Sequence, residues 1–264
     1  MKPINSSSRR AFLKGTAGAI ARKCRTSVIH TGASPPSTSY VNPEQAAKYA
    51  PSGSTLKMIS NPVGFGPKAL DNRQIFHTRL PVITRPMHMI GEEQDMLVFL
   101  PGNCMNSPRI ENTNNAGIEN ISVEDGIYTV GIENSHNITL RDIYSNAWDD
   151  PYFDGFDIDS GTDVLIEDCY LQKHYYYSLN ITDSTRVVVR DSSFIGSELQ
   201  GIYIENSKGI VLDNATCRIP QENAMVAVDS EIQWNGSNVT GTDDAIVMDN
   251  CPGSSLTNLE IRSS

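Results

Sequence analysis

Side chains able to do chemistry lie closest together between residues 146 and 158. Asp149, Asp150, Asp154 and Asp157 fall within nine residues, and Trp148 precedes them. Ionised carboxylates at this density repel one another, so we expect at least one to have a raised pKa or to bind a cation. Solvated loop acids are the alternative interpretation. Trp148 can serve either as a platform for a sugar ring or as an anchor for its own loop.

A second group follows about one repeat later, where residues 173–177 read Lys-His-Tyr-Tyr-Tyr. An imidazole and a phenol can act as base and acid for removal of the proton α to a uronate carboxyl group, the first step of β-elimination or epimerisation. Lys173 could neutralise that carboxylate. Aromatic stacking for the tyrosines and a plain turn position for the histidine are the alternatives. The candidate catalytic residues are Asp154, Asp157, His174 and Tyr177.

A third group is a column in which six of seven repeats carry an acid. The position after each apolar anchor reads Glu111, Glu133, Asp159, Thr182, Glu205, Asp229 and Asp249. Like charges in register repel, so a compensating Ca²⁺ with carboxylate ligands is expected at Glu133 and Asp159. Solvent screening and adaptation to a salty medium are the alternative. Tyr203, which points outward from a neighbouring strand, joins Trp148 and Lys173 as a candidate substrate-binding residue.

These groups require elements that repeat with a period near 23 residues. Seven apolar anchors lie 22, 26, 23, 23, 24 and 20 residues apart, at Ile110, Ile132, Ile158, Ile181, Ile204, Val228 and Met248. In four units a second short strand begins six residues after the anchor. Short alternating strands at this spacing, without amphipathic helices between them, predict the coils of an all-β parallel β-helix of about seven or eight coils. A leucine-rich repeat fits less well, because leucine is scarce at the required positions.

Stacking the predicted coils gives columns of side chains about 4.8 Å apart. The residue after each second strand reads Glu124, Arg141, Glu167, Arg190 and Asp213, which alternates in charge and favours neighbours in register. The next position reads Asp125, Asp142, Asp168, Asp191 and Asn214, short acceptors typical of turns. A helix explains neither column. Ile181 and Ile204 are expected inside the coils.

Residues 80–264 resemble the right-handed parallel β-helix of the pectate-lyase and polygalacturonase superfamily. Asp154-Gly-Phe-Asp-Ile158 resembles the first catalytic motif of polygalacturonases. Where that family carries its further aspartates, this chain has His174 and three tyrosines, so ordinary polygalacturonase hydrolysis is not expected. The resemblance implies the fold, and it leaves the activity open, since the superfamily includes lyases, hydrolases, epimerases and non-catalytic surface proteins.

Charge divides the chain into two parts. Residues 1–102 carry 13 Lys and Arg against 5 Asp and Glu, whereas residues 103–264 carry 8 against 26. The acidic part argues against nucleic-acid binding, which needs cations to replace counterions. It suits cations, neutral sugars, or anionic sugars bridged by metal. No apolar run is long enough for a membrane-spanning helix.

The basic part begins with Ser8-Arg-Arg-Ala-Phe-Leu-Lys14, which resembles a twin-arginine export motif. We expect a signal peptide at 1–21, a linker of low order at 22–75 and the β-helix domain at 76–264, with the protein secreted, periplasmic or on the cell surface. The five cysteines match no metal spacing and predict free or buried thiols, with one disulfide left open. The short end at 248–264 predicts an uncapped coil through which copies could associate.

These observations give a leading hypothesis and two alternatives. The leading one is an exported protein that acts on an acidic polysaccharide by elimination or epimerisation at a uronate, with Ca²⁺ as an expected cofactor. A non-catalytic matrix protein that binds sugars is the second. The third is a glycoside hydrolase using Asp154, Asp157 and a partner such as Glu198.

Overall fold

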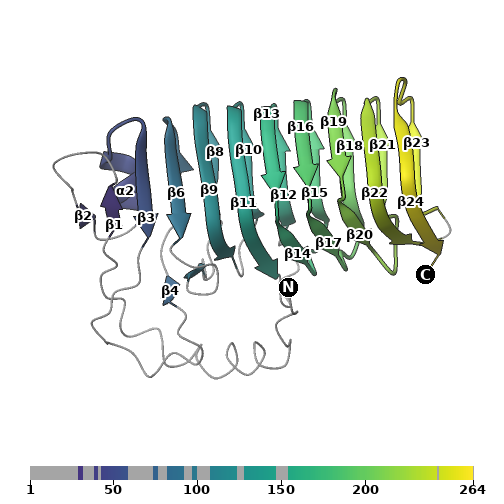
Figure 1. Ribbon diagram of the computed structural model, residues 1–264, viewed down its shortest axis with the longest axis horizontal. Coiled ribbons are helices and arrows are strands. Elements are labelled where there is room, and N and C mark those ends of the chain that lie inside the picture. Colours follow the sequence, from purple (N-terminus) through teal and green to yellow (C-terminus); the bar gives the residue numbers. More distant parts are fainter. Residues whose placement is uncertain are drawn as a thin grey trace.

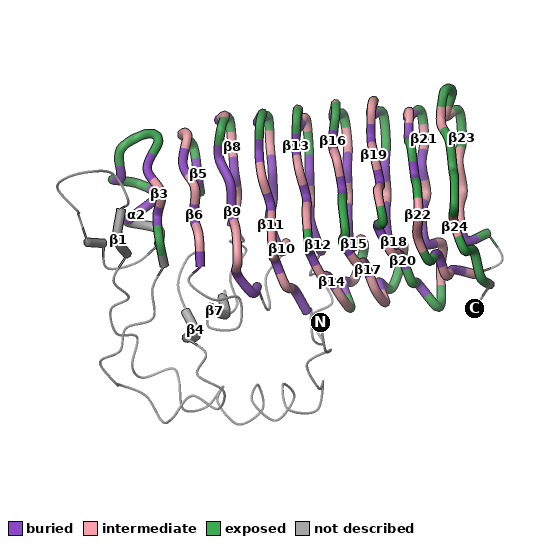
Figure 2. The backbone as a smooth tube through the Cα atoms, viewed as in Figure 1, coloured by how far each residue is buried: buried purple, intermediate pink, exposed green. Residues whose placement is uncertain are grey.

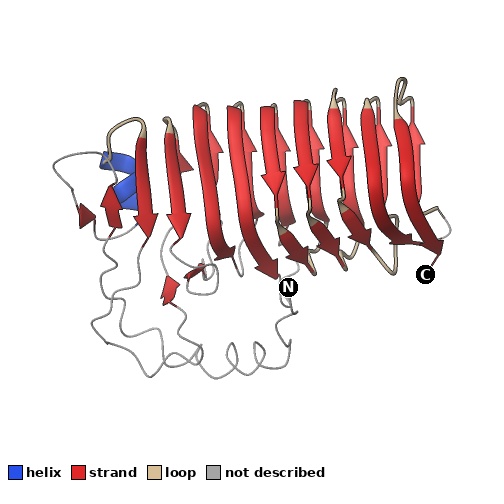
Figure 3. Cartoon of the chain, viewed as in Figure 1, coloured by secondary structure: helices blue, strands red, loops and turns tan. Residues whose placement is uncertain are grey.

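The computed structural model describes residues 29–31, 39–40, 43–58, 74–76, 82–91, 97–99, 108–123, 128–146, 154–242 and 244–263. These residues form a parallel β-solenoid whose coils stack along one axis (Figure 1). Nearly every described element is a strand (Figure 3). The predicted fold class is therefore confirmed.

Each coil contributes one strand to an eight-stranded sheet, in which neighbouring strands are parallel and in register. Because equivalent positions pair directly, a residue type repeated once per coil becomes a column across the sheet. In chain order the strands are β5 (Val82–Ile83), β8 (Arg109–Glu111), β10 (Tyr128–Glu133), β12 (Asp154–Asp159), β15 (Tyr177–Thr182), β18 (Gln200–Glu205), β21 (Met225–Val228) and β23 (Ile246–Asp249).

The rest of each coil belongs to a 16-stranded sheet that bends around the solenoid. The long strand β11 pairs with β13 over its first half and with β14 over its second half, so the bend lies between those two. The strands are β1 (Ile29–Thr31), β2 (Ser39–Tyr40), β3 (Ser54–Met58), β4 (Gln74–Phe76), β6 (Met87–Gly91), β7 (Leu97–Phe99), β9 (Asn114–Val123), β11 (His136–Asn146), β13 (Thr162–Glu167), β14 (Tyr170–Gln172), β16 (Thr185–Arg190), β17 (Ser193–Ile195), β19 (Ile210–Asp213), β20 (Thr216–Arg218), β22 (Ile232–Gly241) and β24 (Ser255–Ser263).

The turn between the two sheets uses a left-handed residue in every coil. Asn, Asp and Ser tolerate this conformation better than other residues with a side chain, because their short polar groups bond locally. Register also corrects one predicted anchor: Ala227, not Val228, pairs with Ile204, which moves Asp229 from the outward column into the turn. The turn column, with φ between 46° and 55°, is Asn112, Asn134, Ser160, Asp183, Asn206, Asp229 and Asn250.

The residue after this turn forms a buried serine ladder, defined as Ser135, Ser184, Ser207 and Ser230. Each hydroxyl accepts a backbone N–H from the preceding coil at 2.9 to 3.2 Å. Each also donates to the carbonyl oxygen two residues earlier in its own coil, at 2.7 to 2.8 Å. Each of the four serines therefore makes one hydrogen bond to the preceding coil and one within its own coil, and no buried hydroxyl of the ladder lacks a partner. Gly161 occupies the equivalent position in the coil after Ser135, so that one boundary lacks the hydroxyl.

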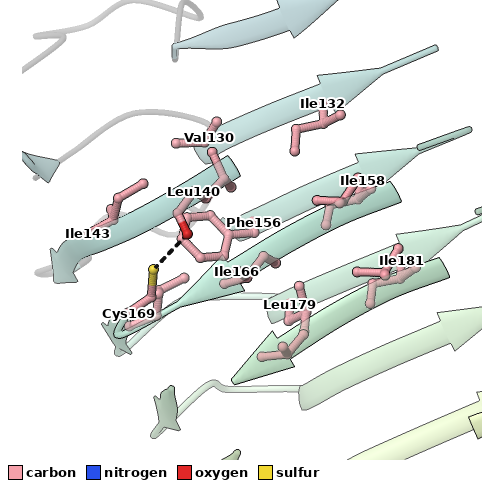
Figure 4. Packing of buried hydrophobic residues seen from close by; sticks show 14 of the residues in the cluster. Val130, Ile132, Leu140, Ile143, Phe156, Ile158, Ile166, Cys169, Leu179 and Ile181 are labelled. Atoms are coloured by element: carbon pink, nitrogen blue, oxygen red, sulfur yellow. Dashed lines mark hydrogen bonds between the residues drawn. The ribbon is translucent and has the colours of Figure 1, made fainter. Parts of the chain in front are cut away.

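Stacked aliphatic side chains fill the coil interior. Ile158, Ile181 and Ile204 are fully buried, as predicted for the last two, and Figure 4 shows Ile158 and Ile181 in successive coils. Cys169 lies in the same core, with its thiol 3.8 Å from the Leu140 carbonyl oxygen. The thiols of Cys169, Cys217 and Cys251 are free, in agreement with the prediction for these three. Cys24 and Cys104 lie outside the described residues.

The predicted charge ladder is present with a different first member. Arg141 contacts Glu167 at 2.8 Å, and Arg190 lies 3.4 Å from Glu167 and 3.7 Å from Asp213. Arg141 pairs in register with Glu119, not with the predicted Glu124. The reason is that β9 continues through the bend without an insertion. The adjacent turn column likewise begins at Asn120 rather than Asp125.

One end of the solenoid is closed by the helix α2 (Pro43–Tyr49), visible beside β3 in Figure 1. Ala46, Ala47 and Ala50 are buried in the same cluster as the coil interior. Within the range expected to be a linker, 22–75, the structure describes α2 and the short strands β1, β2, β3 and β4. Elements this short carry no sustained periodicity in the sequence. Residues 1–21, the proposed signal peptide, lie outside the described residues. No helix in the described part of the chain is long and apolar enough to span a membrane.

Candidate functional site

The Asp154-Gly-Phe-Asp157 segment forms β12 and turns the chain into the eight-stranded sheet. Gly155 and Phe156 are buried in succession, so Asp154 and Asp157 both lie on the outer side. A Cβ at Gly155 would lie 1.8 Å from the Ser178 carbonyl oxygen of the next coil. Glycine is therefore required at this corner for a steric reason, and its place in the motif fixes where the two carboxylates emerge.

Outward side chains of β10, β12, β15 and β18 form three parallel columns, which we call the acid–tyrosine face. Adjacent members of one column are about 4.8 Å apart. The first column is Tyr128, Asp154, Tyr177 and Gln200; the second is Gly131, Asp157, Asn180 and Tyr203; the third is Glu133, Asp159, Thr182 and Glu205.

Among the carboxyl groups of this face, Asp154 has the most strongly raised pKa. Its Oδ1 accepts the backbone N–H groups of Tyr176 at 3.1 Å and Tyr177 at 3.3 Å. Burial raises the pKa of Asp154 to about 6, against the opposing effect of these two hydrogen bonds. A carboxyl group that titrates near neutrality can both accept and return a proton, which suits it to acid–base catalysis.

Asp157 is the second carboxyl group of the face. Burial raises its pKa, and the Asn180 side chain opposes the shift by donating a hydrogen bond to Oδ1 at 2.8 Å. On the other side of Asp157 the column continues with Gly131, which has no side chain. The Arg109 side chain and the Tyr128 ring pack over Gly131, within 3.4 to 3.8 Å of the position that a Cβ would take. Asn180 on the other side fixes the orientation of the Asp157 carboxylate.

Tyr128 and Tyr177 flank Asp154 in the first column, and Tyr203 lies two coils from Asp157 in the second column. The pKa values of Tyr128 and Tyr177 are raised, first by burial and then by nearby aspartates, so both phenols stay protonated near neutral pH. The rings of Tyr177 and Tyr203 are 5.2 Å apart, and the Tyr203 hydroxyl donates to Glu205 at 3.1 Å. The ring contact between the two coils is tilted by 30°, so it is not the parallel stacking expected as an alternative role. The protonated phenols of Tyr128 and Tyr177 remain able to donate.

His174 does not lie on the face, and the prediction that it contacts substrate there is wrong. Its side chain is fully buried inside the coil, and burial lowers its pKa to about 3. The ring nitrogen Nε2 lies 3.3 Å from Thr129 Oγ1 and 3.2 Å from Ser145 Oγ. A neutral, enclosed imidazole cannot exchange protons with a bound sugar. The sequence aligned its coil correctly but did not show which way the ring points.

Glu133, one of the two predicted Ca²⁺ ligands, is paired with a cation instead. Arg109 contacts Glu133 at 2.8 Å and Glu111 at 2.8 Å, so one guanidinium compensates both acids. Asp159 is exposed and accepts a hydrogen bond from Ser160 at 2.9 Å. Among the residues that the structure describes, no three His, Cys, Asp or Glu side chains are grouped closely enough to hold a metal ion.

The other predicted residues have separate positions. Lys173 is exposed in the turn between β14 and β15, and Glu198 is exposed in the equivalent region before β18. Tyr203 lies on the face as predicted. Trp148, with Asp149 and Asp150, lies outside the described ranges.

Two residues of the site were missed in the sequence. Tyr128 precedes its anchor Ile132 by four positions, as Asp154 and Tyr177 precede theirs, so a fourth-position alignment would have found it. Arg109 precedes Ile110 directly and gave no such pattern. It is the cation that pairs with two of the repeating acids, Glu111 and Glu133.

Comparison with known proteins agrees with this architecture. Residues 109–261 match the family model described as right handed beta helix region. No curated protein sequence matches the chain. Among solved structures, the A-module of the mannuronan C-5 epimerase AlgE6 from Azotobacter vinelandii is similar over 83% of this chain and 73% of that chain, with 8% identity and a TM-score of 0.52. The catalytic domain of a GH87 alpha-1,3-glucanase in complex with nigerose covers 74% of this chain and 62% of its own, with 11% identity and a TM-score of 0.22.

Proposed function

The chain belongs to the right-handed β-helix family, and on that premise we propose that it acts on a polysaccharide bound across the acid–tyrosine face. The observation that carries the proposal is the position of Asp154 between Tyr128 and Tyr177 in adjacent coils. Carboxylates, amides and aromatic rings on one surface are the groups that bind sugars. The mannuronan C-5 epimerase with a similar fold supports the substrate class.

The reaction we propose is removal of the proton α to a uronate carboxyl group. The Asp154 carboxylate takes this proton, because its pKa of about 6 leaves it ionised at neutral pH. The Tyr177 phenol, protonated at the same pH, then supplies a proton. Delivery to the opposite side of the same carbon gives the epimer. Delivery to the departing glycosidic oxygen, with formation of a carbon–carbon double bond, completes elimination.

Binding of the uronate carboxylate requires positive charge on or near an acidic face. Arg109 lies at the edge of the face, and Lys173 is the second candidate. Ca²⁺ takes six to eight oxygen ligands, more than Asp159 and its neighbours offer. The described residues do not complete a Ca²⁺ site by themselves, so Ca²⁺ dependence stays a prediction, to be checked by calorimetry with and without a uronate oligomer.

Hydrolysis is the second candidate reaction, and one observation favours it. Asp154 and Asp157 lie on the same strand and both have raised pKa values, which suits one of them to protonate a leaving oxygen. The products separate the two reactions, because hydrolysis creates reducing ends without unsaturation.

The deciding experiment incubates the protein with pectate, alginate and glycosaminoglycans. Near-ultraviolet absorbance detects unsaturated ends, proton NMR detects inversion at C-5, and reducing ends that form without unsaturation indicate hydrolysis. Tyr177→Phe should reduce turnover strongly, whereas Tyr144→Phe, which alters an outward tyrosine on β11 of the other sheet, should not. Binding without any product would support the non-catalytic alternative. The absence of both binding and product would refute the proposal.

Export through the twin-arginine route belongs to the same proposal, since it would bring the protein to polysaccharides outside the cytoplasm. Fractionation of cells that express the wild type or an Arg9→Lys, Arg10→Lys variant tests it. Retention of the variant, but not the wild type, in the cytoplasm is the expected result.

A further inference from the structure

Behind the first column of the acid–tyrosine face, the coil interior changes from aliphatic to polar. Six buried side chains form this polar group: Thr129, Ser145, Asn146, His174, Ser178 and Ser197. Burying polar atoms costs free energy unless hydrogen bonds compensate. The group lies directly beneath the first column, because Thr129 follows Tyr128 and Ser178 follows Tyr177 in sequence.

Hydrogen bonds from His174 connect separate elements within this group. Nε2 lies within 3.3 Å of both Thr129 Oγ1 on β10 and Ser145 Oγ on β11. Thr129 Oγ1 also donates to Ser145 Oγ at 2.7 Å. The imidazole thus links the turn between β14 and β15 to the preceding coil through hydrogen bonds in the coil interior. Because burial keeps the ring neutral, these hydrogen bonds persist over the whole range of neutral and mildly acidic pH.

The turn between β14 and β15, which His174 links to the preceding coil, also leads into the two backbone N–H groups that bind Asp154. Tyr176 and Tyr177 follow His174 by two and three residues, and their backbone N–H groups are the two donors to Asp154 Oδ1. We propose that His174 is a positioning residue, whose buried ring holds the turn so that these two N–H groups stay directed at Asp154. This inference rests on the proposed function, in which Asp154 is the base.

The test reads the Asp154 carboxyl group directly, by carbon-13 NMR titration of the free protein. The Asp154→Asn variant, which lacks the signal, assigns it. His174→Ala should weaken both N–H contacts and raise the pKa of Asp154 by about one unit, since hydrogen bonds to the charged form lower a carboxyl pKa. His174→Gln keeps an amide near Thr129 and Ser145, and should restore most of the wild-type value. Thr129→Val, which removes the partner instead, should shift the pKa in the same direction as His174→Ala.

Ser184→Ala is the matched control, because it removes a buried hydroxyl and its two hydrogen bonds at another corner of the coil. It should lower the melting temperature and leave the Asp154 titration unchanged. An unchanged Asp154 pKa in folded His174→Ala, or an equal shift in Ser184→Ala, would overturn the proposal. If His174→Ala does not fold, Thr129→Val decides the question alone. The titration needs no substrate, so it separates a wrong positioning role from a wrong assignment of activity.

Discussion

Replacing Asp154 by Asn should make the protein more stable at neutral pH. Asn keeps the shape of the side chain and an oxygen for the Tyr176 and Tyr177 N–H groups, and it removes the buried negative charge. Active-site groups commonly lower stability in this way, because the environment that tunes their chemistry is unfavourable for folding.

The magnitude follows from the pKa. In the folded protein the Asp154 pKa is raised from 3.8 to about 6, so between these values the folded state binds more protons than the unfolded state. The free energy of unfolding of the wild type therefore falls as pH rises through this window. Two units correspond to about 3 kcal/mol. Because water reaches part of the carboxyl group, we expect about 1 to 2 kcal/mol.

Urea unfolding of wild type and Asp154→Asn between about pH 4 and pH 8 measures this difference. The two proteins should be nearly equal at pH 4, and the variant should be more stable at pH 8. Asp163→Asn is the control with the opposite sign, since Arg186 lowers the pKa of Asp163 and the loss of its charge should destabilise only above that pKa. A variant that is no more stable than wild type at pH 8, or equally more stable at both pH values, would refute the reasoning.

Three further predictions concern the scaffold. Ile204→Ala should lower the free energy of unfolding by about 2 to 5 kcal/mol through the cavity it leaves, and an unchanged urea midpoint would contradict the observed register. Arg190→Glu should lower the melting temperature more than Arg190→Ala, because it places a third negative charge between Glu167 and Asp213. The difference between the two variants should shrink in high salt, and its absence at low salt would count against the charge ladder. Gly155→Ala should prevent folding or strongly destabilise the protein, because its Cβ would overlap a carbonyl oxygen of the next coil. Gly131→Ala, whose Cβ would meet its nearest atom, Cγ of Arg109, at 3.4 Å, should be far milder, and equal effects would show that space is not the cause.

The fold could be predicted from the sequence because each coil has only 20 to 26 residues, so that its apolar anchor recurs several times along the chain. The interior position of Ile181 and Ile204 and the pairing of Arg190 with Glu167 follow from periodicity alone. The predicted register was wrong at Val228, one residue past the true anchor, and at Glu124, five residues past the true column member Glu119. Both errors arose because the number of residues in a turn varies from coil to coil, so counting along the sequence does not give the register of the hydrogen-bonded strands.

The site was predicted only in part for a related reason. Asp154, Asp157, Tyr177 and Tyr203 lie on regular strands, where alternation tells outward from inward. His174 lies in a turn, where no alternation applies, and its ring enters the core. The helix at Ala46 was missed because seven residues give too little pattern to recognise.

The serine ladder has a consequence for how such a protein can change its size. From Gly161 to Ser230, each successive boundary between coils is built from the same backbone N–H and the same hydroxyl, which also bonds a carbonyl of its own coil. Figure 2 shows the accompanying alternation of buried and exposed positions repeating from coil to coil. A duplicated or deleted coil would meet a compatible joint on both sides, since each coil contacts only its neighbours. Gene rearrangement within the repeats can therefore lengthen or shorten the outer face in steps of about 4.8 Å, without a new core having to evolve.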